Sequence, residues 1–173
     1  TLILNDEYVK MYGGKLILVV DDTIGSEAKP IEPAAYKLIE EGMGWLEVNY
    51  DKKVIYKSDR IEKYYEYANE LIKKGYMYVC SCDRDKMHEL KVKGIECGCR
   101  QLPPVVQMAR WKKMFTAEEG SMIVRLKTSM TDPDPAFRDR VMFRISDRPH
   151  AKIGRKYRVY PMLDFSSAID DHY

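Results

Sequence analysis

The stretch Lys15–Thr23, with the sequence KLILVVDDT, decides the fold that this chain is expected to adopt. Its apolar run is followed at once by Asp21, Asp22 and Thr23. An apolar run without polar alternation is typical of a strand buried on both faces of a parallel sheet. Open α/β sheets bind ligands at the carboxyl ends of such strands. We therefore predict an α/β fold with Asp21 at a ligand site; the alternative is that both aspartates only cap a helix or turn.

Helical patterns flank this strand. Residues 1–12 have apolar residues at helical spacing and are followed by two glycines, which commonly end a helix. Residues 33–41 begin with a proline and precede a glycine, so a second helix is expected there. Residues 45–48 form a short strand candidate. A helix followed by a strand is half of a βαβ unit, and the strand expected before residue 1 is not in the sequence.

A long helix is expected next, capped by Ser58 or Asp59 and ended by Gly75. Later segments show an apolar period of two, which is typical of strands. The elements expected after residue 75 are a helix at 104–115, strands at 122–127, 140–145 and 157–161, and a helix from residue 164.

Four cysteines form two C-x-C pairs, Cys80 with Cys82 and Cys97 with Cys99. Four thiolates on two tight turns can surround Zn²⁺ tetrahedrally, and Gly98 permits a sharp turn in the second pair. We predict a structural zinc ion, because four protein ligands leave no open position for catalysis. Free thiols and disulfides are the alternatives, and a reducing compartment disfavours disulfides.

A basic stretch covers residues 138–158, with eight Lys and Arg residues against two Asp. Strand alternation is expected to place Arg138, Arg140 and Arg144 on one face and apolar residues on the other. An arginine face suits phosphate binding. A solvated face with surface ion pairs is the other interpretation, and the spacing alone favours neither.

Composition gives broad limits. The chain has 173 residues, 45% of them hydrophobic and 32% charged, with a formal net charge of +2. This suffices for one core, or for one core with an inserted module, and the balanced charge identifies no partner. No apolar stretch has membrane-spanning length and the start does not read as a signal peptide, so we expect a cytoplasmic protein with no membrane partner.

Five further motifs follow one another along the chain. They are DDT at 21–23, YKSDRIEKYYEYANELIKKGYMYVC at 56–80, TDPDPAFRDRVMFRI at 131–145, PHAKIGRKYRVYPM at 149–162 and DFSSAIDDH at 164–172. In this order they resemble the catalytic core of class I aminoacyl-tRNA synthetases for glutamate and glutamine. Asp170, Asp171 and His172 resemble glutamyl rather than glutaminyl enzymes, and PAFRD together with the cysteine pairs resembles the archaeal type.

The resemblance implies a Rossmann-type parallel sheet in residues 1–57 and 158–173. A mixed α+β acceptor-stem-binding insertion would interrupt it at 58–157 and carry the zinc module at 80–99. The implied activity is ATP-dependent ligation of glutamate to tRNA, with Mg²⁺.

The resemblance also implies roles for single residues. Asp21 matches the position that pairs with the substrate α-ammonium group, and Leu163 and Ser167 match other substrate-binding positions. Arg138, Arg140 and Arg144 would meet the tRNA acceptor arm.

The family's HIGH motif would lie before Thr1, and its KMSKS loop beyond Tyr173. We therefore expect no catalytic residue in this chain and no measurable adenylation by the chain alone. Val19 stands where relatives usually have Arg, and Leu163 where they usually have Tyr, so the pocket is altered or the relative is degenerate. The alternatives are a non-catalytic zinc-stapled RNA-binding module and a glutaminyl-tRNA synthetase.

Overall fold

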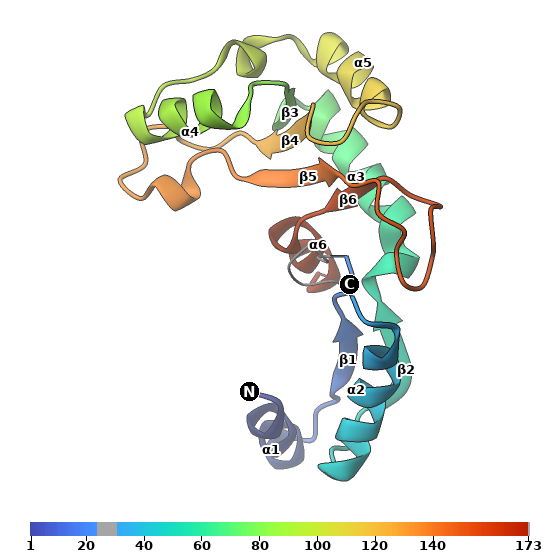
Figure 1. Cartoon of the computed structure of the whole chain (residues 1–173). Coiled ribbons are helices and arrows are strands. Elements are labelled where there is room, and N and C mark those ends of the chain that lie inside the picture. The colour runs from blue at the N-terminus through green and yellow to red at the C-terminus, as the bar shows by residue number, and fades with distance from the viewer. Residues whose placement is uncertain (24–30, 173) are drawn as a thin grey trace.

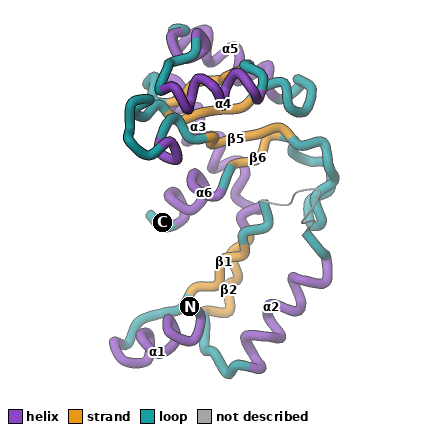
Figure 2. Tube along the Cα trace, turned by 60° about the vertical axis from the view of Figure 1, so that its left-hand side comes forward, coloured by secondary structure: helices purple, strands orange, loops and turns teal. Residues whose placement is uncertain are grey.

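The chain folds around two separate β-sheets, as a computed structural model that describes residues 1–23 and 31–172 shows (Figure 1). Helix α6 (Leu163–Asp170) lies between the two sheets in both views (Figures 1 and 2). The smaller sheet pairs β1 (Ile17–Val20) with β2 (Asp51–Tyr56) in parallel. The larger sheet is antiparallel, in the order β3 (Met77–Cys80), β4 (Ile123–Leu126), β5 (Val141–Ile145) and β6 (Val159–Pro161).

The small sheet confirms the α/β prediction. Helix α1 (Leu2–Tyr12) ends at Gly13, whose φ of 68° lies in the left-handed region that glycine adopts without strain. Helix α2 (Pro33–Trp45) lies between β1 and β2 in the sequence, so the two parallel strands are joined by a helical crossover.

Two expectations for this half of the chain are wrong. Strand β1 is not buried on both faces, since Ile17 is 55% and Val19 is 40% exposed; within the described residues only β2 pairs with it. Residues 45–48 are not a strand, because α2 continues through two glycines to Trp45. The amide of Val48 then turns back to donate to the carbonyl of Met43, and the real strand starts at Asp51.

The long helix α3 (Ile61–Lys73) is confirmed, and Gly75 follows it with a φ of 79°. Its predicted cap is wrong. A 3₁₀ turn at Lys57–Arg60 precedes the helix, and neither side chain caps it. The hydroxyl of Ser58 donates to Asp22 at 2.6 Å, and the carboxylate of Asp59 pairs with Lys152 at 2.5 Å. Both side chains therefore hold distant segments instead of the helix end.

The main hydrophobic core lies between α3, α5 (Pro104–Met114) and the larger sheet. Tyr65, Trp111 and Phe143 meet there, with the ring centroids of Trp111 and Phe143 5.4 Å apart. On β3 the alternation is strict: Met77 and Val79 enter this core, and Tyr78 and Cys80 form a second cluster with Cys97 on the opposite face. Strand periodicity thus directs Cys80 toward the cysteine module.

The remaining helical elements surround the cysteine module and the loop before β5. Helix α4 (Arg84–Lys93) is capped by Asp83, whose carboxylate accepts from the amide of Lys86 at 2.8 Å. Short 3₁₀ turns occupy Gly98–Gln101 and Pro135–Phe137. Among the described residues, no helix is long and apolar enough to cross a membrane.

Candidate functional site

Asp21 and α6 meet through one buried lysine. The Nζ of Lys57 donates to Asp21 Oδ2 at 3.0 Å, to Ser166 Oγ at 3.0 Å and to Ser167 Oγ at 2.9 Å. The Lys57 side chain is 4% exposed and that of Asp21 is 19% exposed. The carboxyl end of β1 and the first turns of α6 therefore form one polar site, where open α/β sheets bind ligands.

Asp22 has a different and structural set of partners. It is 2% exposed, and its carboxylate accepts from Ser58 N at 2.8 Å, Ser58 Oγ at 2.6 Å and Tyr36 OH at 3.0 Å. Burial, and then the charge of Asp22, raise the pKa of Tyr36, so that this hydroxyl stays a donor. These bonds fix α2 and the start of the 3₁₀ turn against the end of β1.

The loop between β5 and β6 is fastened to the same place. Nε2 of His150 lies 2.5 Å from the backbone oxygen of Asp22. Two residues later, the ammonium of Lys152 lies over the ring of Tyr56, 3.8 Å from its centroid, and pairs with Asp59. The loop thus joins the larger sheet to the carboxyl ends of β1 and β2.

The other end of α6 is anchored on α3. Asp170, whose side chain is 4% exposed, accepts from Arg60 Nη1 at 2.6 Å and from Tyr64 OH at 2.7 Å. Burial, and then the hydrogen bond to Asp170, raise the pKa of Tyr64. A salt bridge from Arg140 Nη2 to Asp164 Oδ2 at 2.6 Å holds the first turn of α6.

The four cysteines are brought together as a metal site requires. The four sulfur atoms of Cys80, Cys82, Cys97 and Cys99 lie within 4.8 Å of one another, and the sulfurs of Cys80 and Cys97 are 3.9 Å apart. Tetrahedral zinc–thiolate bonds place sulfur atoms roughly 3.8 Å apart. All four are free thiols. The hydrogen bond from Cys80 lowers the pKa of Cys97, and the same bond, with burial, raises the pKa of Cys80.

Two side chains from α5 support the cysteine module. Gln107 is 2% exposed; its Oε1 accepts from Val79 N at 2.8 Å, and its Nε2 donates to the carbonyl of Cys99 at 2.6 Å. Arg110 Nη2 donates to Ser81 Oγ at 2.8 Å and lies 3.6 Å from Cys99 Sγ, where its charge offsets that of a thiolate. The arrangement fits a structural ion.

The three predicted RNA-binding arginines do not share a free face. Arg138 donates through Nε to the carbonyl of Asp132 and through Nη1 to those of Lys91 and Val92, so it ties the loop before β5 to the end of α4. Arg140 pairs with Asp164, and Arg144 is half-buried on β5. Only Arg144 lies within the strand.

The comparison with protein families decides what these features belong to. The family described as tRNA synthetases class I (E and Q), catalytic domain, matches residues 1–173. The chain belongs to this family.

Relatives agree with this class I synthetase assignment. The glutamate–tRNA ligase of Pyrococcus horikoshii is 51% identical over 98% of this chain, and that of Methanothermobacter thermautotrophicus is 46% identical over 98%. This chain covers 30% of the length of each. A solved glutamate tRNA ligase from Elizabethkingia meningosepticum, described as in complex with its amino acid, aligns with a TM-score of 0.61 at 15% identity. That alignment covers 98% of this chain and 37% of the solved one, and shows a shared fold.

Asp21 and Ser167, two of the predicted substrate-binding residues, both accept from Lys57, a residue that sequence analysis did not single out. Lys57 has no local signal, because its partners lie 36, 109 and 110 residues away. Leu163 is 50% exposed at the start of α6, and nothing in the structure explains either Leu163 or Val19.

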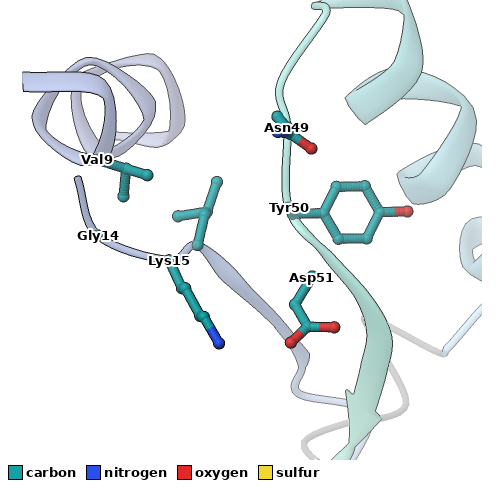
Figure 3. A pocket seen from close by; sticks show the side chains of 7 residues that line it. Val9, Gly14, Lys15, Asn49, Tyr50 and Asp51 are labelled. Carbon is teal, nitrogen blue, oxygen red and sulfur yellow. The ribbon is translucent and has the colours of Figure 1, made fainter.

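A shallow pocket of about 270 Å³ opens at the opposite end of the small sheet (Figure 3). Lys15 comes from the segment before β1, and Asn49, Tyr50 and Asp51 come from the segment that enters β2, with the ring of Tyr50 pointing away from Val9. It lies at the amino ends of both strands, away from Asp21, and is not the expected ligand site of a synthetase sheet.

Proposed function

We propose that this chain is part of the catalytic domain of a glutamate–tRNA ligase, which joins glutamate to tRNA with ATP and Mg²⁺. The observation that carries the proposal is that Asp21, at the carboxyl end of β1, and Ser167, on α6, share the ammonium group of Lys57. This occurs in a chain about half identical to archaeal glutamate–tRNA ligases. The chain spans about a third of those relatives, so the activity proposed is that of the full-length protein.

In this proposal Asp21 receives the α-ammonium group of glutamate. Its carboxylate is held in place because Oδ1 accepts from both the amide and the hydroxyl of Thr23, at 3.3 and 3.0 Å. A fixed carboxylate at the edge of a crevice suits a charged hydrogen bond to an ammonium group. Leu163 and Ser167, from the same helix, are proposed to border the substrate.

The division of the chain follows the same proposal. Residues 1–57 and 158–173 belong to a Rossmann-type domain, and 58–157 to an insertion that binds the tRNA acceptor stem. Arg138, Arg140 and Arg144 are proposed to face the acceptor arm, although Arg138 already makes several bonds within the protein. The cytoplasmic location remains a prediction from the sequence.

The proposed metal is a structural Zn²⁺ bound by Cys80, Cys82, Cys97 and Cys99. The sulfur spacing and the partial burial of the cluster support it. The ion would cross-link the end of β3 to the turn after α4, and with four protein ligands it takes no part in the reaction.

Two other functions differ in a measurable way. A non-catalytic RNA-binding module would bind acceptor RNA without charging it, and a glutaminyl-tRNA synthetase would prefer glutamine. The near relatives, which are named glutamate–tRNA ligases, favour glutamate.

Asp21→Asn in the full-length protein tests the amino-acid site. We expect the KM for glutamate to rise about 10- to 100-fold, because a hydrogen bond to a charged group contributes roughly 1.5–3 kcal/mol. Steady-state aminoacylation measures this. Asp51→Asn, at the exposed start of β2, is the matched control and should leave KM unchanged. Equal KM values for both variants would show that Asp21 does not bind the ammonium group of glutamate.

A further inference from the structure

Lys57 is a buried cation, and the amino-acid site proposed above assigns it no role. Its Nζ has three acceptors: Asp21 Oδ2, Ser166 Oγ and Ser167 Oγ. We call these three acceptor groups the ammonium site. An ammonium group has three N–H donors, so the site satisfies it completely. Three acceptor oxygens, one of them from a negatively charged carboxylate, suit any primary ammonium group.

The backbone holds Lys57 in this position. Tyr56 pairs with Val20 in the parallel register of β2 with β1, so the next residue lies beside Asp21. On the other side, the amide of Ser58 donates to Asp22 Oδ1 at 2.8 Å. The lysine is therefore directed into the site by strand register and by its neighbour, not by a flexible loop.

Stability alone gives a weak reason for such a pair. Burying an ion pair costs desolvation energy that its attraction often only offsets. Asp21 remains 19% exposed while Lys57 is 4% exposed, so a ligand from solvent has access to the carboxylate but not to the lysine. A second cation arriving there would meet a carboxylate that is already neutralised.

We propose that Lys57 is an internal competitor for the substrate ammonium group. It occupies the ammonium site when no amino acid is bound, and an α-amino acid must share Asp21 with it or displace it. The inference rests on the proposed role of Asp21. Two like charges on one carboxylate repel each other, so Lys57 weakens amino-acid binding and sets the KM of the site.

A vacated ammonium site should accept a free alkylammonium ion. In Lys57→Ala, n-propylammonium replaces the lost methylenes and the ammonium group of the lysine atom for atom. We expect it to raise the melting temperature of this variant by about 2–4 °C more than tetramethylammonium at equal ionic strength, because the latter has no N–H donors. The unaltered chain should show no such difference.

Lys74→Ala is the matched control, because it breaks an exposed ion pair with Glu70 and leaves the site filled. An equal response of Lys57→Ala and Lys74→Ala to n-propylammonium would overturn the proposal.

Lys57→Gln in the full-length protein gives a second reading if the alanine variant does not fold, since glutamine retains a donor but no charge. We expect its KM for glutamate to fall roughly tenfold. An unchanged or higher KM would contradict the competitor role. A full-length protein that forms no glutamyl-tRNA would overturn the proposed function. The alkylammonium measurement would still decide whether the site that Lys57 fills binds other ammonium groups.

Discussion

Replacing Cys80 with serine is expected to remove stoichiometric zinc from the purified chain. Cys80 is fully buried at the end of β3, and its sulfur lies 3.9 Å from that of Cys97. A hydroxyl is a poor zinc ligand, so three thiolates would remain. Apparent binding free energies of structural zinc reach about 10–16 kcal/mol in zinc-finger peptides, which sets an upper limit on the stability lost.

The loss of ordered structure in Cys80→Ser should be confined to the cysteine module. The main core of α3, α5 and the larger sheet does not depend on the ion, whereas the second cluster consists largely of the cysteines themselves. We expect faster proteolysis within residues 81–102 and retained far-ultraviolet circular dichroism. Elemental analysis by mass spectrometry measures the metal.

Ser81→Ala is the control for Cys80→Ser, because Ser81 lies between two ligands but is exposed and is not one of them. It should retain zinc. If the unaltered chain contains no zinc after purification with zinc in the medium, the proposed metal site is contradicted.

Asp139→Ala is expected to destabilise the chain by about 3–5 kcal/mol, the usual cost of breaking a buried charge pair. Asp139 is 1% exposed. Its carboxylate accepts from Tyr78 OH at 2.8 Å, Arg100 Nε at 2.9 Å and Thr128 N at 2.7 Å. Its φ of 37° is also a conformation that alanine adopts only with strain.

Asp139 therefore connects the cysteine module to the start of β5. Urea unfolding of Asp139→Ala measures the loss of stability. The free energy of unfolding of Asp139→Asn should lie between those of Asp139→Ala and the unaltered chain, since asparagine tolerates the backbone conformation but loses the charge. Asp134→Ala is the matched control: its carboxylate makes an exposed bond to the amide of Ala136, and the change should cost at most about 1 kcal/mol. Similar losses at both positions would contradict the role of Asp139.

Local pattern predicted the elements that depend on neighbours in sequence. The apolar run before Asp21 gave a strand, the glycines after residues 12 and 74 gave helix ends, and alternation in 141–145 directed Phe143 into the core. It failed at residues 45–48, where apolar side chains suggested a strand. There α2 continued across two glycines to Trp45, and the amide of Val48 bonds back to the carbonyl of Met43 instead of to a strand.

The contacts that form the site could not be predicted from local sequence patterns. His150 meets Asp22 across 128 residues, and Lys57 meets α6 across more than one hundred. Such pairs depend on how the larger sheet is placed against β1 and β2, and no local spacing records that. The same reason explains Arg138, which reads as part of a basic face but binds carbonyls at the end of α4.

The most direct measurement is the charging of tRNA by the full-length protein with ATP, Mg²⁺ and either glutamate or glutamine at equal concentration. We predict ATP-dependent formation of glutamyl-tRNA, with little or no glutaminyl-tRNA. Preferential charging with glutamine, or tight binding of acceptor RNA without any aminoacyl product, would contradict the proposal that this chain is part of a glutamate–tRNA ligase.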